Sequence, residues 1–500
     1  MTRNPLSKKH LNNIPARAAE FVLRTRATLG NVRGRGPLAG GVASATVRRA
    51  NSAAQAVLIC MAVLVQGCKQ TAAEVEYDPQ AIMSTQLTRD SVQVSDWMMG
   101  VNRLYPGDPA PVPAPPAGYK PIYLSHYGRH GSRYLAAPGQ YAHVHEVLSR
   151  AGREGELSGF GEEIFARYEA VSPLYIRREG ELTGTGAAQH RAIASRMYRN
   201  YPELFRKGSK VVANSTNYER TMLSMQNFTQ TLVSLSPGLD LHTDASKVYQ
   251  GRINQHSPEN PEVTSEDVRW KSPDAPWRPA FWQYFRGAFD WRPVCGRLFK
   301  DPEWAGDATD AFKFVFDLYS IALVVPGCPE KCKGFFDVFT SGELSLLGQM
   351  DNYAFYMEKS RTPLGNKRGC YLSEVVLGSI LDEAASDLEE GVRVRLRFGH
   401  DGCIMALFAL LKLDGWNAEL TDPSEAWKVW DVSQIPMAAN FQIVLFGRGG
   451  LVKDPVFCLL LNEEPMALPL EDLGGHYYRW DDFLAYCRPI LQEARDGLAK

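Results

Sequence analysis

The sequence has no excess of positive charge, and it lacks the common loops that bind nucleotides or activate a serine. Its 500 residues include 55 lysines and arginines against 56 acidic residues, and after residue 68 the balance is 45 basic to 55 acidic side chains. A protein that binds a nucleic-acid backbone presents a basic face, so we expect no nucleic-acid partner. The absence of a Walker-type loop and of a Gly-x-Ser-x-Gly elbow argues against a P-loop nucleotidase and a serine hydrolase.

Cysteine and histidine are too scattered for a recognisable metal site. Of nine cysteines, seven follow residue 68, and Cys328 and Cys332 are close enough for a local disulfide. A zinc site would need two further ligands at short spacing, and the odd number leaves at least one thiol unpaired. His143 and His145 fall in a predicted helix, where their rings point apart. We therefore expect no metal and no other cofactor.

No apolar run is long enough to span a bilayer comfortably, but one run has the features of an export signal. Arg48 and Arg49 precede an apolar stretch at 53–65, and Gly67 directly precedes Cys68. A basic flank, a short apolar core and a small residue before cysteine are typical of a bacterial lipoprotein signal. We expect export to the periplasm or outer membrane, with a lipid anchor on Cys68. The alternative is a short buried helix.

Residues 1–68 are interpreted as a structureless leader that ends in this signal. Its first part is too long for an ordinary positive segment, so we expect a misassigned start with Val47 as the true first residue. Residues found before Val47 by amino-terminal sequencing of the precursor would contradict this. A proline-rich lead at 69–118 follows, and its prolines at 106–118 exclude helix and central strand. We interpret it as a spacer before the main domain at 119–500.

The first predicted strand of the main domain ends in a glycine-flanked motif. Residues 119–127 lead into residues 128–133, Gly-Arg-His-Gly-Ser-Arg. The two glycines predict a tight loop where the backbone can approach a ligand closely. Arg129, His130 and Arg133 are therefore candidate site residues.

Two later strand ends carry comparable polar residues. The predicted strand 210–215 precedes an amphipathic helix with Arg220 at its beginning, and the strand 392–398 precedes His400, Asp401 and an apolar helix. Ligands of α/β sheets gather at the carboxyl ends of the strands. We therefore expect these side chains to converge with the first motif.

Alternating strands and helices predict an α/β fold with a mostly parallel sheet flanked by helices. A further helix is expected at 183–206 and a last strand at 441–446. Between about 241 and 385 the alternation weakens, and aromatic residues cluster in helical patterns. We interpret this segment as an inserted, largely helical cap.

The candidate residues suit phosphoryl transfer. A phosphate monoester carries up to two negative charges, and arginine forks match its oxygens, so Arg129, Arg133 and Arg220 are expected to bind it. His130 lies between two of these arginines in sequence, and a neutral imidazole can attack phosphorus. His400 is expected to donate a hydrogen bond to the phosphate.

Asp401 is the candidate acid that protonates the leaving group. The amino end of a helix favours its carboxylate form, whereas a bound phosphate disfavours ionisation because of its like charge. We expect the acid to work best at mildly acidic to neutral pH.

These motifs resemble those of the histidine acid phosphatases, which form clade 2 of the histidine phosphatase superfamily. The resemblance covers residues 119–447. Within that clade, segments 125–134, 214–221 and 436–441 are similar to bacterial multiple inositol polyphosphate phosphatases, which remove phosphates from inositol polyphosphates including phytate. That group usually carries His-Ala-Glu where this chain has His-Asp-Gly at 400–402, so the proton donor resembles that of the classical bacterial phytases.

The resemblance implies His130 as nucleophile, Asp401 as proton donor, and a phosphate pocket made of Arg129, Arg133, Arg220 and His400. It also implies an α/β core, a helical cap and no metal. The expected function is thus a metal-independent phosphomonoesterase that acts on inositol polyphosphates through a phosphohistidine. A monomer is expected.

Two alternatives stay open at this stage. One is a general acid or sugar-phosphate phosphatase that uses the same residues, and the other is an exported lipoprotein that binds phosphorylated ligands without turnover. A highly phosphorylated ring would need more cations around the mouth of the site, and the candidates for these are Arg177, Arg178, Arg191 and Lys207.

Overall fold

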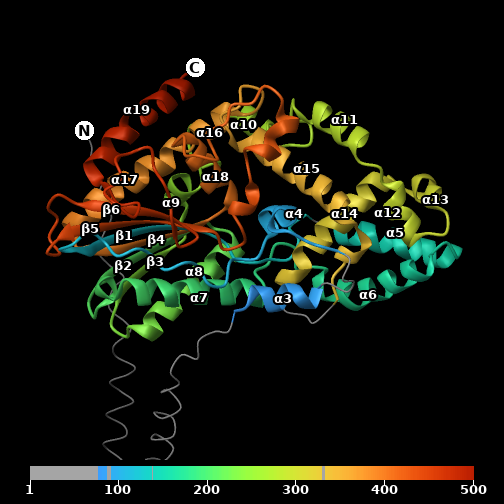
Figure 1. Cartoon of the computed structure of the whole chain (residues 1–500), viewed down its shortest axis with the longest axis horizontal. Helices are drawn as coiled ribbons and strands as arrows, with labels where there is room; N and C mark the ends of the chain where they lie inside the picture. The colour runs from blue at the N-terminus through green and yellow to red at the C-terminus, as the bar shows by residue number, and fades with distance from the viewer. Residues whose placement is uncertain (1–76, 87–91, 138, 329–332) are drawn as a thin grey trace, which may run out of the picture. The chain divides into compact units, whose positions relative to one another are not determined.

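The computed structural model describes residues 77–86, 92–137, 139–328 and 333–500. They contain an eight-stranded sheet in the order β3-β2-β4-β1-β5-β6-β7, with β8 paired to β6, and helices cover both faces of this sheet (Figure 1). The strands are β1 Tyr119–Arg129, β2 Lys210–Ser215, β3 Asp240–Asp244, β4 Val392–Gly399, β5 Asn440–Arg448, β6 Val456–Leu461, β7 Glu464–Pro465 and β8 Tyr478–Arg479. The leader, with Val47 and Cys68, lies outside the described residues, as does Cys332.

Seventeen α-helices accompany these strands in the described residues. They are α3 Pro79–Gln86, α4 Asp96–Met99, α5 Gln140–Glu154, α6 Gly159–Tyr175, α7 Gly184–Asn200, α8 Glu219–Leu235, α9 Lys247–Ile253, α10 Ser265–Arg269, α11 Arg278–Ala288, α12 Arg292–Leu298, α13 Pro302–Ala308, α14 Ala311–Val324, α15 Ser341–Lys359, α16 Lys367–Tyr371, α17 Glu374–Glu390, α18 Asp401–Leu410 and α19 Trp480–Leu498. The helix predicted at 183–206 is α7, which ends at Asn200. A short 3₁₀ helix that begins at Pro202 follows it.

The parallel half of the sheet brings the three strand-end motifs to one edge. β4 lies between β1 and β2 and runs parallel to both, with Arg129 opposite Gly399 and Ser215 opposite Phe398. The three predicted strands that precede the motifs are confirmed. Because their carboxyl ends are in register, the residues that follow them begin at the same level.

The other half of the sheet is antiparallel, so the predicted α/β fold is confirmed with a mixed sheet. β5 runs antiparallel to both β1 and β6. It begins with Asn440 opposite Gly128, at the edge where β1 ends. The chain crosses that edge just before β5, since the Ala439 carbonyl accepts from the Arg129 backbone N–H at 2.7 Å. A strand that starts there can only run back along β1.

Both ends of the segment expected as a cap belong to the sheet domain. Residues 240–244 form β3, an edge strand parallel to β2, and its mostly exposed residues lack the apolar alternation that would have marked a strand. At the other end, α17 packs against the sheet, where Asp387 pairs with Arg395 at 2.5 Å and accepts from the Tyr123 hydroxyl at 2.9 Å. The helical insertion is therefore shorter than 241–385.

The helical part of the molecule also includes residues from outside that insertion. Helices α5 and α6 lie beside α12 and α14 in Figure 1, and a short bridge joins Leu157 to Phe299. His143 contributes to this contact, with Nδ1 2.7 Å from Asp317 and Nε2 3.0 Å from Thr309. His145 instead faces the ring of Phe165, so the two histidines point apart as predicted.

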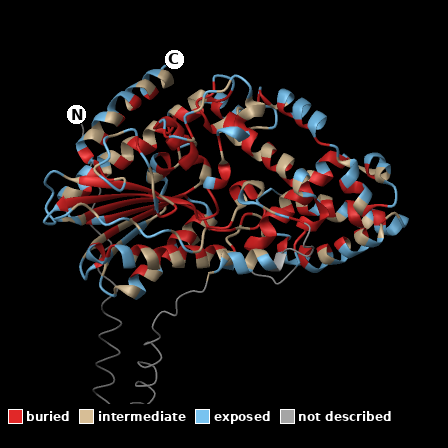
Figure 2. Ribbon diagram, viewed as in Figure 1, coloured by how far each residue is buried: buried red, intermediate tan, exposed pale blue. Residues whose placement is uncertain are grey.

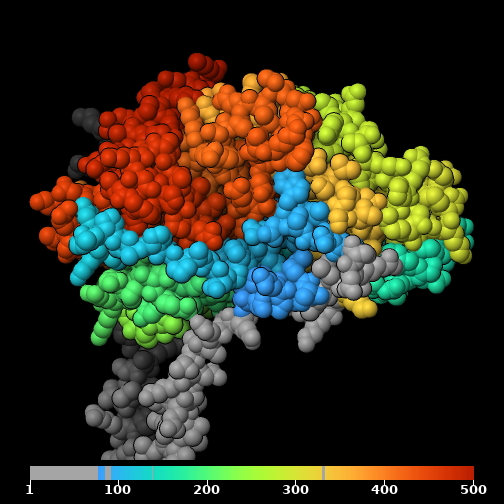
Figure 3. All heavy atoms as spheres, viewed as in Figure 1, coloured from blue at the N-terminus to red at the C-terminus, as the bar shows by residue number. Residues whose placement is uncertain are grey.

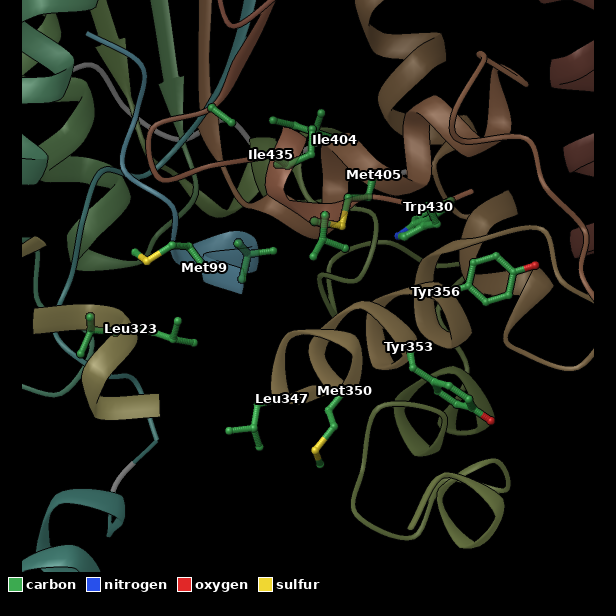
Figure 4. Packing of buried hydrophobic residues seen from close by; sticks show 14 of the residues in the cluster. Met99, Leu323, Leu347, Met350, Tyr353, Tyr356, Ile404, Met405, Trp430 and Ile435 are labelled. Atoms are coloured by element: carbon green, nitrogen blue, oxygen red, sulfur yellow. The ribbon is translucent and has the colours of Figure 1, made fainter. Parts of the chain in front are cut away.

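One continuous hydrophobic core joins the helical part to the sheet. Figure 4 shows Leu347 and Tyr356 of α15 gathered with Met405 of α18 and with Trp430. Figure 2 shows that the central strands are buried along most of their length, whereas the outer faces of the helices are exposed. This shared core holds α15 in a defined position beside α18.

The described part of the proline-rich lead packs on the domain rather than forming a free spacer. It runs across the surface in Figure 3 between the C-terminal segment and the helices around residue 200. Gln189 of α7 donates to the Tyr77 hydroxyl at 3.1 Å, and Tyr477 donates to the Pro113 carbonyl at 2.6 Å. The Arg103 carbonyl accepts from the backbone N–H of Met437 at 2.9 Å, so the lead supports the chain that enters β5.

The described residues form no group of three or more side chains that could hold a metal ion. None of the helices in those residues is both long and apolar enough to cross a bilayer. The predicted disulfide between Cys328 and Cys332 involves Cys332, which lies outside the described residues. Several cysteines in the described residues are buried and form no disulfide. These thiols are Cys295, Cys370, Cys403, Cys458 and Cys487.

Candidate active site

The loop after β1 is packed so tightly that it requires glycine. A Cβ on Gly131 would lie 2.4 Å from the carbonyl oxygen of Gly186 at the start of α7. Thr183 caps α7 by accepting from the Gly186 backbone N–H at 3.1 Å, and its hydroxyl donates to the Ser132 carbonyl at 3.0 Å. The glycines predicted a close approach of the loop backbone, and in the structure Gly131 makes this approach to the beginning of α7. The contact fixes the backbone at His130.

His130 is oriented by a backbone carbonyl. His130 is 3% exposed, and its Nδ1 lies 2.9 Å from the carbonyl oxygen of Gly131. A carbonyl only accepts, so Nδ1 carries the hydrogen in this contact and Nε2 keeps its lone pair. The ring lines a cavity at the sheet edge, and it is therefore set up as a nucleophile rather than as a donor.

Arg129 is fully buried beneath this cavity. Its Nη1 donates to the carbonyls of Val101 and Ile435, the latter at 2.9 Å, and its Nη2 lies 2.7 Å from Oδ2 of Asp401. Arg129 thus links the lead, the chain before β5 and the acidic residue of α18.

Arg133 and Arg220 line the cavity directly. Arg220 is the second residue of α8, and its guanidinium lies 4.9 Å from the centre of the Tyr218 ring. Its Nε is buried without a hydrogen-bond partner among the described residues, so it is available to a ligand oxygen. Burial, followed by the nearby Arg129, lowers the pKa of Arg133 to about 10.

His400 and Asp401 begin α18. His400 Nε2 lies 3.2 Å from the Thr216 hydroxyl, and its ring is 5.8 Å from that of His130. Asp401 Oδ1 accepts from the backbone N–H of Gly402 at 2.6 Å. The three strand ends therefore bring together all six predicted residues: five of them line the cavity, and Arg129, which does not line it, pairs with Asp401.

Burial and the surrounding cations keep both histidines neutral. Burial, then the charges of Arg129 and Arg220, lowers the pKa of His130 well below its ordinary value. Burial and Arg220 lower the pKa of His400 to about 3. A neutral His130 retains the lone pair that nucleophilic attack requires.

Asp401 is subject to opposing influences. Burial raises the pKa of its carboxyl group, but the guanidinium of Arg129, then His400 and the Gly402 backbone N–H, outweigh it, so the net pKa lies below the ordinary value. Without a bound anion the group is a carboxylate at neutral pH. An anion bound between Arg133 and Arg220 would reverse this balance.

The sequence matches a family model over the region that carries these residues. The model describes the histidine phosphatase superfamily (branch 2), and it matches residues 128–448. The chain belongs to this superfamily. It is therefore a phosphatase with an α/β fold, as the resemblance of its motifs implied.

Solved structures of other phosphatases share this histidine phosphatase fold. The multiple inositol polyphosphate phosphatase of Bifidobacterium longum, crystallised with inositol hexasulfate, has a TM-score of 0.59 at 18% identity, over 77% of this chain and 96% of that chain. The phytase of D. castellii has a TM-score of 0.57 at 14% identity, over 85% of this chain and 90% of that chain. Among curated proteins none matches the sequence.

The phosphatase site is larger than the sequence indicated, because the helical part supplies a second wall. The cavity measures about 380 Å³. Its lining from the helical insertion consists of Asn254, His256, Lys271, Phe355, Glu358 and Lys359. No local motif marks these residues, since none follows a predicted strand. The packing of α15 against α18 brings Phe355, Glu358 and Lys359 to the sheet edge, and the loop that carries Asn254 and His256 is held there by Gln255, which donates to the Gly402 carbonyl at 3.1 Å.

The cations expected around the mouth lie elsewhere. Among the described residues that line the cavity there is no Arg177, Arg178, Arg191 or Lys207. Arg178 stacks on the Tyr134 ring at 4.2 Å and donates to Glu181 at 2.8 Å, and Arg191 donates to Asn227 at 2.8 Å. These four candidates are therefore not the additional cations of this cavity, since none of them lines it and Arg178 and Arg191 are engaged by other side chains.

Proposed function

We propose that this histidine phosphatase hydrolyses phosphomonoesters of inositol polyphosphates through a phosphohistidine, without a metal ion. The observation that carries the proposal is the orientation of His130. Its Nδ1 is engaged by the Gly131 carbonyl at 2.9 Å, which leaves Nε2 for the cavity that Arg133 and Arg220 line.

In the first step, Nε2 of His130 attacks phosphorus and the bond to the ester oxygen breaks. Arg133, Arg220 and His400 bind the phosphoryl oxygens and stabilise the charge of the transition state. The bound phosphate repels the carboxylate of Asp401 and competes for Arg129, so the pKa of Asp401 rises. The protonated Asp401 then gives its proton to the leaving oxygen.

In the second step, a water molecule attacks the phosphohistidine. Asp401, now a carboxylate, takes a proton from this water as the bond between nitrogen and phosphorus breaks. His130 regains its neutral form and phosphate leaves. The arginines supply the charge stabilisation that a metal ion supplies in other phosphatases.

The inositol polyphosphate substrate is favoured by two considerations. Two relatives of the same fold are a multiple inositol polyphosphate phosphatase and a phytase. The cavity lining is also rich in cations, with Lys271 and Lys359 in addition to the arginines. A simple phosphomonoester would occupy only the arginine end.

The deciding experiment measures phosphate release from phytate and from p-nitrophenyl phosphate by the chain from Lys69 onward, between acidic and neutral pH, with a chelator present. We expect release from phytate that survives the chelator. Activity on the small ester alone would indicate a general acid or sugar-phosphate phosphatase. Binding without release from either would indicate a phosphate-binding lipoprotein.

We further propose export of the chain and lipid attachment at Cys68, on the basis of the leader sequence alone. The anchored protein would act as a monomer on small phosphorylated substrates outside the cytoplasm. A Cys68→Ser variant would then appear in the soluble fraction, whereas the parent protein would stay with the membrane.

A further inference from the structure

A chain of hydrogen bonds runs from the backbone at the beginning of α8 to the ring of His400. Oγ1 of Thr221 lies 2.7 Å from the carbonyl oxygen of Tyr218 and 2.9 Å from that of Thr216. The same atom lies 2.8 Å from Oγ1 of Thr216, which in turn lies 3.2 Å from Nε2 of His400. Both threonine side chains are fully buried, so the chain is shielded from solvent.

The number of hydrogens sets the direction of this chain. The Tyr218 carbonyl can only accept, and it is the nearest partner of the Thr221 hydroxyl, so it takes the single hydrogen of that hydroxyl. The oxygen of Thr221 then accepts from Thr216, which has no second hydrogen to give. The contact between Thr216 and His400 therefore requires the imidazole to donate, and this places the ring hydrogen on Nε2.

His400 has only one ring hydrogen. Burial, and next the charge of Arg220, lower the pKa of His400 to about 3, so the ring is neutral above that pH. Nδ1 is then left with its lone pair, and it has no hydrogen-bond partner among the described residues. The ring lines the cavity. The titratable groups that face it from β1 and its loop, from the beginning of α8 and from α18 are Arg129, His130, Arg133, Tyr218, Arg220 and Asp401.

The aromatic ring of Tyr218 helps to hold the imidazole in this orientation. The two rings meet edge to face, with their centres 4.9 Å apart and their planes at 86°. An imidazole that turned to present Nε2 to the cavity would lose both this contact and the hydrogen bond to Thr216. The two histidines of the site are therefore held in opposite tautomers, since His130 donates from Nδ1 to the Gly131 carbonyl.

We propose that Thr216 and Thr221 are positioning residues that hold the hydrogen of His400 on Nε2, so that Nδ1 accepts a hydrogen bond from the bound phosphate. The proposal rests on the proposed function and reverses the donor role that the sequence led us to expect for His400. Only a phosphoryl oxygen that carries a hydrogen can donate to Nδ1. The substrate is therefore bound as the monoanion of the phosphomonoester, which predominates below a pH of about 6.

Nitrogen NMR of the protein labelled in its histidines tests the tautomer directly, because protonated and unprotonated ring nitrogens resonate far apart. His400→Gln identifies the signals of His400. We expect a hydrogen on Nε2 in the ligand-free parent protein and in Thr216→Ser, which keeps the hydroxyl. In Thr221→Val the hydrogen of Thr216 becomes available to His400, so the ring hydrogen should move to Nδ1. A parent protein with the hydrogen on Nδ1 would overturn the proposal.

Thr229→Val is the matched control for these variants. Thr229 is also a buried threonine of α8, and its hydroxyl donates to the Met225 carbonyl at 2.8 Å. It does not line the cavity, so the variant should match the parent protein in the tautomer of His400 and in anion binding.

Inhibition by inorganic anions provides the second readout. At pH 5 phosphate carries hydrogens on its oxygens, whereas sulfate has the same shape and carries none. One hydrogen bond is at stake, so phosphate should inhibit the hydrolysis of p-nitrophenyl phosphate about tenfold more strongly than sulfate in the parent protein. This preference should fall severalfold in Thr216→Val and Thr221→Val, where Nδ1 can carry the hydrogen. An unchanged preference in both variants would overturn the roles of the two threonines.

The two proposals fail in different ways. A parent protein that released no phosphate from any ester would overturn the proposed function, whereas the NMR signals of His400 do not depend on turnover. A change in turnover alone, with the tautomer and the anion preference unchanged, would show that the threonines have only a structural role. Thermal unfolding confirms that each variant is folded.

Discussion

His130 and Asp401 occupy one cavity, but they are prepared for opposite roles. The carbonyl of Gly131 fixes the imidazole with Nε2 unprotonated, whereas Arg129 holds the Asp401 carboxyl group in its charged form at 2.7 Å. In the proposed mechanism the nucleophile is thus ready before substrate binds. The proposed acid becomes ready only when the substrate phosphate counteracts Arg129.

Asp401→Asn separates these roles, because asparagine keeps the shape of the side chain but cannot donate the proton. We expect kcat for phytate to fall by about 10² to 10⁴, with a much smaller loss for p-nitrophenyl phosphate, whose leaving group hardly needs protonation. Steady-state rates on both substrates measure this. Equal losses would exclude Asp401 as the acid, and His130→Ala should abolish turnover of both.

At the scale of whole elements, a buried polar network holds the start of β5 against α7 and the lead. Arg196 of α7 donates to both oxygens of Glu463, at 2.9 and 2.7 Å, and Tyr105 donates to the same carboxylate at 2.8 Å. Asn440, the first residue of β5, donates to the Tyr105 hydroxyl at 3.0 Å. The backbone just before Asn440 contacts Arg129, so this network supports the candidate site from a distance.

Removing Arg196 should therefore destabilise the protein more than removing a surface arginine. Glu463 is only 3% exposed, and the loss of one partner of a buried ion pair leaves its charge uncompensated. We expect Arg196→Met to lower the free energy of unfolding by about 3 kcal/mol, measured by urea denaturation. Arg153→Met, at an exposed position of α5, serves as the control. A similar small loss in both variants would contradict a stabilising role for the network.

At the scale of the whole molecule, buried histidines determine how stability responds to acid. Burial lowers the pKa of His126, His190 and His400 to about 3 each. Their folded pKa lies below that of the unfolded chain, so their contribution is complete above about pH 6.5 and is lost as the pH falls towards 3. Asp351 acts in the opposite sense, because burial raises its pKa to about 6, so its contribution decreases as the pH rises from about 4 to 6.

His190→Leu tests this dependence, since His190 packs between the rings of Phe228 and Phe398 without needing charge. Each such histidine should cost about 2 kcal/mol of stability at pH 5 relative to pH 7. Between pH 7 and pH 5, we expect the free energy of unfolding of the variant to fall by about 2 kcal/mol less than that of the parent. Urea denaturation at both pH values measures this. His242→Leu, at an exposed position, should behave as the parent does. If the stability of His190→Leu and of the parent changed equally with pH, buried His190 would not contribute to the loss of stability in acid.

The amino-acid sequence by itself determined the phosphatase class and the six candidate residues that the structure brings together. Apolar alternation marked the strands before His130, Arg220 and His400, and glycines marked the loop that follows β1. These signals are local, because a strand and its terminal loop are specified within about ten residues of chain. The convergence of the motifs then followed from the rule that parallel strands share a carboxyl edge.

Only the tertiary structure decided the direction of β5, the edge strand β3 and the second wall of the cavity. β3 lacks apolar alternation because it is exposed, and β5 runs back because the preceding chain must cross the edge to reach Arg129. Lys271 and Lys359 are more than a hundred residues from His130, and no pattern around them indicates a site. Their position depends on a core built from α15, α18 and the loops between them. The packing of such distant segments is what a local pattern of residues does not encode.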